Sequence, residues 1–127
     1  MHPYSNSKNE SDNLAIGYDA LGGAIDGGTH NIAIGNYSLD ANKTGDNNVA
    51  VGRYALRSTT TGTNNTASGT MSLYSATTAI YNTATGYKAL HTTSTGTHNT
   101  ALGSNTLLTN TTGAYNVAVG HGALYSN

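Results

Sequence analysis

The sequence predicts an all-β fold, a parallel β-solenoid of about seven coils of 17 residues. The motif N-x-A-x-G recurs along the chain, first at a spacing of 18 residues and then five times at a spacing of 17. A leucine lies four residues after each motif glycine. Self-similarity at a fixed period is typical of repeat architectures, in which each unit stacks on its neighbours.

Three residues define the repeat in every unit. The motif asparagines are Asn13, Asn31, Asn48, Asn65, Asn82, Asn99 and Asn116. The motif glycines are Gly17, Gly35, Gly52, Gly69, Gly86, Gly103 and Gly120. The leucines are Leu21, Leu39, Leu56, Leu73, Leu90, Leu107 and Leu124. The repeat array covers residues 13–127 and follows a polar N-terminal tail of residues 1–12.

Each coil is expected to contain two strands and a turn. N-x-A-x-G would form the first strand, x-A-L the second, and a T-T-G stretch the turn into the next coil. The unit is shorter than helical repeats and lacks an apolar stripe of helical period. The only proline, Pro3, lies outside the array, which leaves strand pairing unbroken.

The two faces of the first strand differ in character. Asn, Ala and Gly alternate along one face, and all are small enough to pack closely. We expect the asparagines to form a ladder from coil to coil and the glycines to allow positive φ or a close backbone approach. The leucine is then the large apolar anchor of each coil.

The opposite strand face is aliphatic at both ends of the array and polar in the middle, with pairs such as Val49 and Val51 against Thr83 and Thr85. One leucine per coil is a small apolar core for 17 ordered residues. Burying this second face against other copies of the chain would add apolar area. We therefore expect a homo-oligomer, with three chains around an axis.

Composition excludes several classes of function. Charged residues make up 9% of the chain and the net charge is -1, which argues against nucleic-acid binding. The chain has no cysteine, and no window is long and apolar enough to predict membrane insertion. We expect no cofactor.

The residues that could carry chemistry are scattered over the repeat. Asp19, Asp26, Asp40 and Asp46 occupy different positions of the unit, which favours solvated loop residues over a catalytic pair. His30 and His98 share a position just before the motif asparagine, so a threefold axis could gather copies of one of them around a metal. The other units vary there, which favours surface histidines. We predict no catalytic or metal site and no enzyme.

Two rows of residues suggest contacts at the surface. Tyr18, Tyr37, Tyr54 and Tyr87 lie just after motif glycines, where they could bind sugars or a receptor or pack over the next coil. The runs Thr59, Thr61, Thr63 and Thr93, Thr95, Thr97 would each share one face if extended, as in ice-binding solenoids. Interruption of these runs in other coils argues against ice binding.

The motif itself resembles a known group of repeats. Asn47 to Gly52, with the sequence NNVAVG, is similar to the motif of trimeric autotransporter adhesin heads. The longer unit, as in Asn82 to Leu90, resembles repeats of phage tail fibres. The resemblance implies a left-handed, trimeric β-roll. It suggests a fibre or adhesive module that contacts a glycan or protein receptor at the cell surface, in an extracellular or virion-surface location. The alternatives are a self-assembling extracellular filament, with end-to-end polymerisation, and an ice-binding solenoid.

Overall fold

The computed structural model describes residues 12–23 and 26–127 as a β-solenoid with seven strands. The N-terminal tail, apart from Asp12, lies outside these residues. The strands are β1 (Leu14–Ile16), β2 (Ile32–Ile34), β3 (Val49–Val51), β4 (Thr66–Ser68), β5 (Thr83–Thr85), β6 (Thr100–Leu102) and β7 (Val117–Val119). They form one parallel sheet in sequence order, so the predicted all-β solenoid is confirmed.

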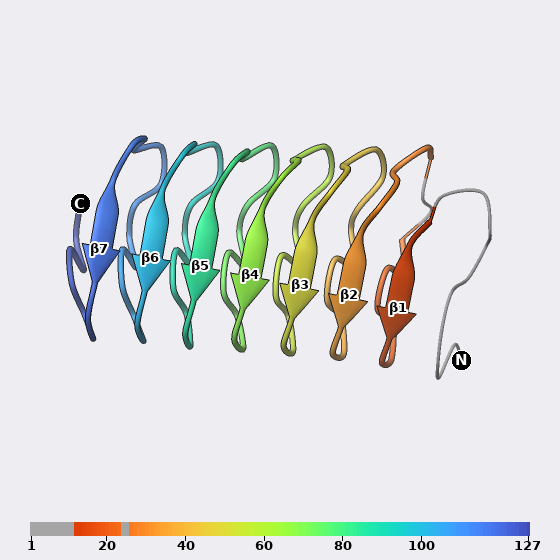
Figure 1. Ribbon diagram of the computed structural model, residues 1–127, viewed down its shortest axis with the longest axis horizontal. Coiled ribbons are helices and arrows are strands. Elements are labelled where there is room, and N and C mark those ends of the chain that lie inside the picture. The colour runs from red at the N-terminus through yellow and green to blue at the C-terminus, as the bar shows by residue number, and fades with distance from the viewer. Residues whose placement is uncertain (1–11, 24–25) are drawn as a thin grey trace.

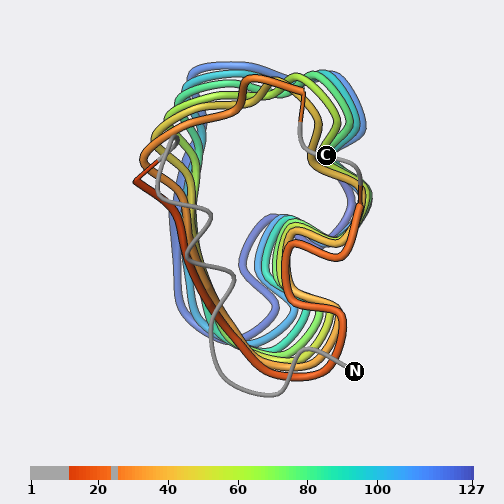
Figure 2. The ribbon, with the colours of Figure 1, turned by 90° about the vertical axis from the view of Figure 1, so that its right-hand side faces the viewer.

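The sheet keeps one register throughout the described chain. Ala33 pairs with Ala50, and each following strand places its motif alanine opposite the next. In Figure 1 the seven strands lie side by side along the long axis, each joined to the next by one loop around the solenoid. Seen along that axis in Figure 2, the coils superimpose closely, with one nearly straight side and an inward fold opposite it.

The motif asparagines form the ladder that the repeat predicts. The side-chain oxygen of Asn48 accepts hydrogen bonds from the backbone N–H of Asn65 at 3.0 Å and from its side-chain amide at 3.2 Å. The amide of Asn48 also donates to the carbonyl of Gly62 at 2.8 Å. The five motif asparagines from Asn31 to Asn99 are buried, so their amides need hydrogen-bond partners inside the protein, whereas Asn13 and Asn116 are half-buried.

The motif glycines occupy a conformation that an L side chain rarely adopts. At Gly52, φ is +134°, and a Cβ would lie 2.7 Å from the carbonyl carbon of Gly69 in the next coil. The same close approach recurs from coil to coil along the stack. Both reasons expected for glycine, positive φ and close backbone contact, therefore apply together.

The segment around each leucine is a turn and not the second strand expected from the sequence. Tyr54, Ala55 and Leu56 form part of a turn, with Tyr54 and Leu56 in the left-handed region at φ of 62° and 51°. Leu56 is nevertheless fully buried, like its counterparts from Leu39 to Leu107. A left-handed residue reverses the chain sharply, so the leucine reaches the core from a corner of the coil.

Candidate functional site

The outward face of the sheet extends over all seven strands, and we call it the sheet face. Its residues are Leu14, Ile16, Ile32, Ile34, Val49, Val51, Thr66, Ser68, Thr83, Thr85, Thr100, Leu102, Val117 and Val119. None carries a charge. They alternate with the buried motif alanines and are half-buried or exposed, as the strand period requires.

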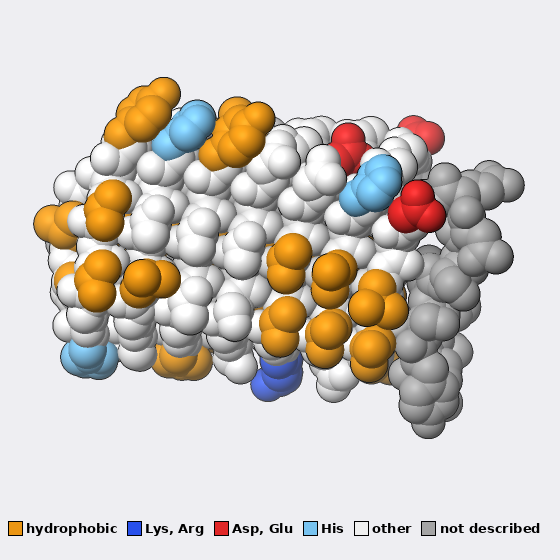
Figure 3. All heavy atoms as spheres, in the orientation of Figure 1, with side chains coloured by type: hydrophobic (Ala, Val, Ile, Leu, Met, Phe, Trp, Pro, Cys, Tyr) orange, Lys and Arg blue, Asp and Glu red, His pale blue; other side chains and the backbone are white. Residues whose placement is uncertain are grey.

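Aliphatic and hydroxyl side chains occupy separate parts of the sheet face. Figure 3 shows apolar side chains at the two ends of this face and an uncoloured waist between them. The waist corresponds to β4 and β5, whose outward residues are threonine and serine. Ile16 on β1 and Leu102 on β6 remain 42% and 39% exposed, so apolar area is available on both sides of the waist.

A second feature is a run of stacked rings, which we call the aromatic column: Tyr18, Tyr37, Tyr54, Tyr74 and His91. The rings of Tyr37 and Tyr54 are stacked with centroids 5.3 Å apart. Those of Tyr74 and His91 are stacked at 5.1 Å. Edge-on contacts join Tyr18 to Tyr37 and Tyr54 to Tyr74. The column thus passes continuously over five successive coils.

Both arginines of the chain lie against the aromatic column. The guanidinium carbon of Arg53 is 4.4 Å from the ring centroid of Tyr54, and that of Arg57 is 5.3 Å from the same centroid. Arg57 donates a hydrogen bond to the Tyr74 hydroxyl at 2.8 Å. Its Nε lies 3.7 Å from an oxygen of Asp40.

This packing shifts the pKa values of residues in the aromatic column and of the charged residues beside it. Burial raises the pKa of Asp40, although the positive charge of Arg57 acts in the opposite direction. The hydrogen bond with Tyr74 raises the pKa of Arg57, which remains charged. Desolvation and the nearby Tyr18 raise the pKa of Tyr37. Burial lowers the pKa of His91, and the charge of Lys88 adds to that effect.

The four tyrosines singled out from the sequence divide between two environments. Tyr18, Tyr37 and Tyr54 belong to the aromatic column, whereas Tyr87 stands apart at 48% exposed, with the Lys88 amine 5.3 Å from its ring. Sequence reasoning missed Tyr74, His91 and Arg57. All three lie nine residues after a motif asparagine, whereas Tyr37 and Tyr54 lie six residues after one, so aligning the units does not by itself join the two positions into one column.

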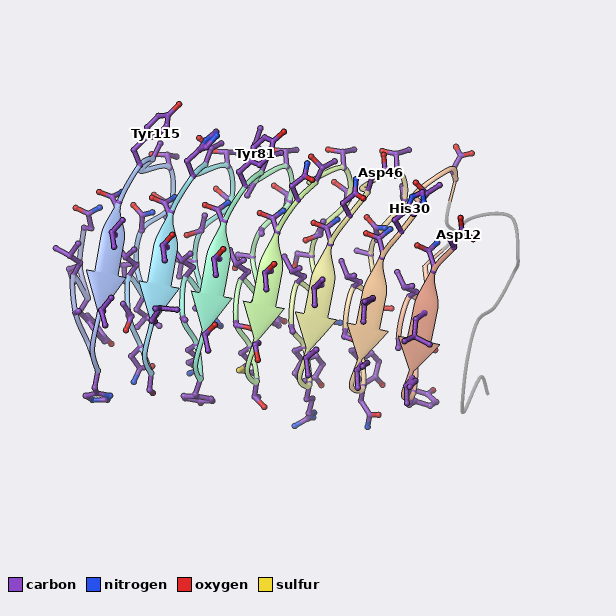
Figure 4. The ribbon with its side chains drawn as sticks, viewed as in Figure 1. Asp12, His30, Asp46, Tyr81 and Tyr115 are labelled. Carbon is purple, nitrogen blue, oxygen red and sulfur yellow. The ribbon has the colours of Figure 1, made fainter. Side chains whose placement is uncertain are left out.

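A shorter row of rings is formed by residues that directly precede the motif asparagines, just before the strands begin. His98 is stacked between Tyr81 and Tyr115, with both centroid distances at 4.9 Å. Figure 4 shows Tyr81 and Tyr115 on the same edge of the solenoid as Asp12, His30 and Asp46. His30 lies 3.5 Å from Asp12, and Asp46 accepts hydrogen bonds from the backbone and hydroxyl of Thr29.

The structure brings two of the four aspartates near each other. A Cβ added at Gly22 would lie 3.0 Å from the Cβ of Asp19 and 3.1 Å from a side-chain oxygen of Asp40. Asp46 is instead bound to Thr29, and Asp26 is exposed. His30 and His98 stay four coils apart, and His121 is exposed. Within residues 12–23 and 26–127, no group of three or more histidine, aspartate or glutamate side chains could hold a metal ion.

The threonine runs do not form the outward row that their spacing suggests. Thr59 and Thr93 are fully buried, whereas Thr61 and Thr95 are exposed. The backbone is bent here and does not follow the period of an extended strand. The runs are not extended, so the condition under which each would share one face is not met.

Comparisons with known proteins leave the family open, since no family model, curated protein or solved structure matches this chain. In the described part of the chain, no helix has the length and apolar character needed to cross a membrane.

Proposed function

We propose that the chain is a non-enzymatic structural and adhesive fibre module, a trimeric β-roll like those of phage tail fibres or adhesin heads. In this role it would contact a cell surface from an extracellular or virion location. The observation that carries the proposal is the sheet face, which is free of charge along all seven strands. Depletion of charge with exposed aliphatic side chains is typical of the core of a protein–protein interface. The left-handed winding implied by the resemblance stays a prediction.

The order of side chains on the sheet face favours other copies of the same chain as the partner. In a parallel arrangement with the chains aligned along the solenoid axis, each aliphatic strand contacts the same strand of another chain. The hydroxyl-bearing strands β4 and β5 likewise contact β4 and β5 of that chain. In an antiparallel arrangement centred on β4, Val49 and Val51 of β3 would face Thr83 and Thr85 of β5. The parallel arrangement places fewer buried hydroxyl groups opposite apolar side chains, so the free-energy cost of removing those hydroxyls from water is lower.

Light scattering of the purified chain at known concentration tests the association. We expect a trimer, converted to monomer by Ile34→Glu, because that change buries a charge in the interface. Asn64→Glu, at an exposed corner away from the sheet face, is the matched control and should remain trimeric. A monodisperse wild-type monomer would refute the proposal, and open-ended polymers would favour the filament.

Cross-linking tests the parallel arrangement, because the chain contains no cysteine. A short bismaleimide should join Leu14→Cys chains to one another. An equal mixture of Leu14→Cys and Val119→Cys chains should give few mixed products. Predominant mixed products would indicate antiparallel association.

A further inference from the structure

The two arginines are concentrated in one coil without being required by the repeat. Arg53 occupies a position filled by tyrosine, asparagine, threonine, serine or histidine in other units. Arg57 occupies one filled by residues as different as Asp40, Tyr74 and Leu108. The fold therefore accepts small, acidic, aromatic and aliphatic side chains at these positions and does not require arginine at either.

The aromatic column holds both guanidinium groups in place. Each donates a hydrogen bond to a tyrosine hydroxyl, Arg57 to Tyr74 at 2.8 Å and Arg53 to Tyr54 at 3.1 Å. Each also lies against the Tyr54 ring. Stacking and hydrogen bonding reduce the rotamer entropy that an arginine loses when it binds a ligand.

Several donors of these guanidinium groups point to a ligand outside the chain. Within the described residues, Nη2 of Arg57 and both Nε and Nη1 of Arg53 make no hydrogen bond. The Nε of Arg57 is buried and lies 3.7 Å from Asp40, so the donors of Arg57 that a ligand can reach are those of the terminal nitrogens. Guanidinium donors of this kind match the paired oxygens of a carboxylate or sulfate group.

The rings limit the class of ligand. One face of Tyr37 and one face of Tyr54 are covered by their stack on each other, and both guanidinium groups lie against the Tyr54 ring, so these rings offer little platform for a neutral sugar ring. The hydroxyls of Tyr54 and Tyr74 accept hydrogen bonds from the arginines, and each can donate its own proton to an oxygen atom of a sugar. Anionic oxygens supply the affinity in such a site, and sugar hydroxyls add polar contacts.

We infer that Arg53 and Arg57, held by Tyr54 and Tyr74, form a binding site for an acidic carbohydrate that carries carboxylate or sulfate groups. The inference deepens the proposed adhesive function by naming the class of receptor. Asp40 moderates the site, because its carboxylate competes with the ligand for Arg57. In an oligomer, copies of the site would bind one polysaccharide with increased avidity.

Calorimetric titration of the full chain tests this site with three probes of similar length: a heparin oligosaccharide, an oligogalacturonate and a neutral cello-oligosaccharide. We expect binding of at least one acidic probe and none of the neutral one. The sulfated and carboxylated probes distinguish the two sources of anionic oxygens. Equal binding of the neutral probe, or no binding of either acidic probe, would overturn the inference.

Variants separate specific recognition from general charge. Arg57→Gln should weaken binding about tenfold or more, as expected for loss of hydrogen bonds to a charged group. Lys43→Gln, an equal charge change at an exposed residue, should leave affinity within about twofold, since exposed charges are screened. Asp40→Asn should tighten binding. An equal loss in the two glutamine variants, or weaker binding by Asp40→Asn, would contradict the site.

The double variant Arg53→Lys, Arg57→Lys keeps the charge but removes the planar fork, and it should also bind weakly. Full binding by this variant would overturn the inference. Circular dichroism melting of each variant confirms that it is folded. Light scattering on the same samples distinguishes the two proposals. A monomer that binds the acidic probe would refute only the trimer, and a trimer that binds neither probe would refute only the site.

Discussion

At the scale of single residues, this fold depends on left-handed backbone at positions that are not glycine. Each unit places its leucine there, with Leu56 at φ of 51° and Leu73 at 48°. A left-handed residue with a Cβ costs about 1–2 kcal/mol. Burial of a leucine side chain contributes about 1.5–3 kcal/mol. The leucine therefore offsets the strain of its own corner, whereas a glycine would relieve the strain but leave the core empty.

A second residue-scale feature is the exception at Ala79, where other units have glycine. A Cβ added at Gly45 would lie 2.3 Å from the carbonyl oxygen of Gly62 in the next coil and 2.5 Å from the side-chain oxygen of Asn42, three residues before it. In the unit that contains Ala79, the residue three positions earlier is Ala76, which lacks the atoms that would clash. Both alanines are buried. Ala76 therefore removes the contact within the coil, and the Cβ of Ala79 still has to fit against the carbonyl oxygen of the next coil.

The contact within the coil predicts coupling between the two positions. Ala76→Thr alone should lower the free energy of unfolding by about 1–3 kcal/mol through overpacking. Combined with Ala79→Gly, the same change should cost at least about 1 kcal/mol less, because Thr59 and Thr93 occupy this position beside glycine. Urea unfolding of the two single variants and the double variant measures the coupling. Additive effects would contradict the coupling.

At the scale of one coil, stability depends on a few interior side chains. The coils between the two end coils each bury the motif asparagine, the motif alanine and the leucine, and backbone hydrogen bonds outside the strands also join neighbouring coils. For example, the Leu56 N–H donates to the carbonyl of Ser72 at 3.1 Å. The coil is thus a narrow unit with one large apolar side chain and little capacity to rearrange around a cavity.

Leu56 provides a direct test of this coil. Leu56→Ala should lower the free energy of unfolding by about 2–5 kcal/mol, since the site is fully buried. Leu56→Asp should prevent folding, because the carboxylate would be buried without a partner. Leu124→Ala is the matched control. Leu124 has the same left-handed backbone but is 49% exposed, so the change should have a much smaller effect. Equal melting losses in the two alanine variants would refute Leu56 as the anchor.

The aromatic column predicts that stability depends on pH. The pKa of His91 is lowered in the folded chain, mainly by burial. An unfolded histidine has a pKa of about 6.5. As the pH falls below that value, the unfolded chain takes up the proton first. The stability due to neutral His91 is therefore full at higher pH and is lost as the pH falls towards the folded pKa.

Thermal melting between pH 5 and 8 checks this effect. Tyr74 occupies the equivalent position in the preceding coil, so the fold accepts tyrosine there. His91→Tyr should therefore make the melting temperature depend less on pH over this range. His121→Gln is the control, because His121 is exposed and should leave the profile unchanged. A profile that stays the same in the tyrosine variant would exclude His91 as its source.

At the scale of the whole molecule, the solenoid is a stack in which each coil contacts its two neighbours. The pairings of β1 with β2 through β6 with β7 connect adjacent coils only. In such a stack, stability is approximately a sum of terms for each coil and for each interface between neighbours. The stability of the stack then depends less on which coil is present than on whether its strand and turns align with those of its neighbours.

Deletion experiments test this modular character. Removal of residues 65–81, one complete unit, should leave a folded solenoid, since Asn64 then precedes Asn82 and the ladder continues in register. Removal of residues 65–73 deletes fewer residues but takes away one strand and its leucine, leaving residues 74–81 as an unmatched loop. We expect the smaller deletion to lower the melting temperature more. The reverse order would refute the modular description.

The sequence by itself determined the period, the parallel stacking and the interior columns of Asn, Ala and Leu. These follow from residues that recur at a fixed spacing, because stacked identical coils bring identical positions together. The tertiary structure decided the turn at x-A-L, the burial of Thr59 and the meeting of Arg57 with Tyr54 and Tyr74. Left-handed residues break the two-residue period of an extended strand. After a left-handed residue, the direction of the next side chains depends on how the whole coil folds back on itself. Neither the alternation of residue types nor their local spacing specifies that path.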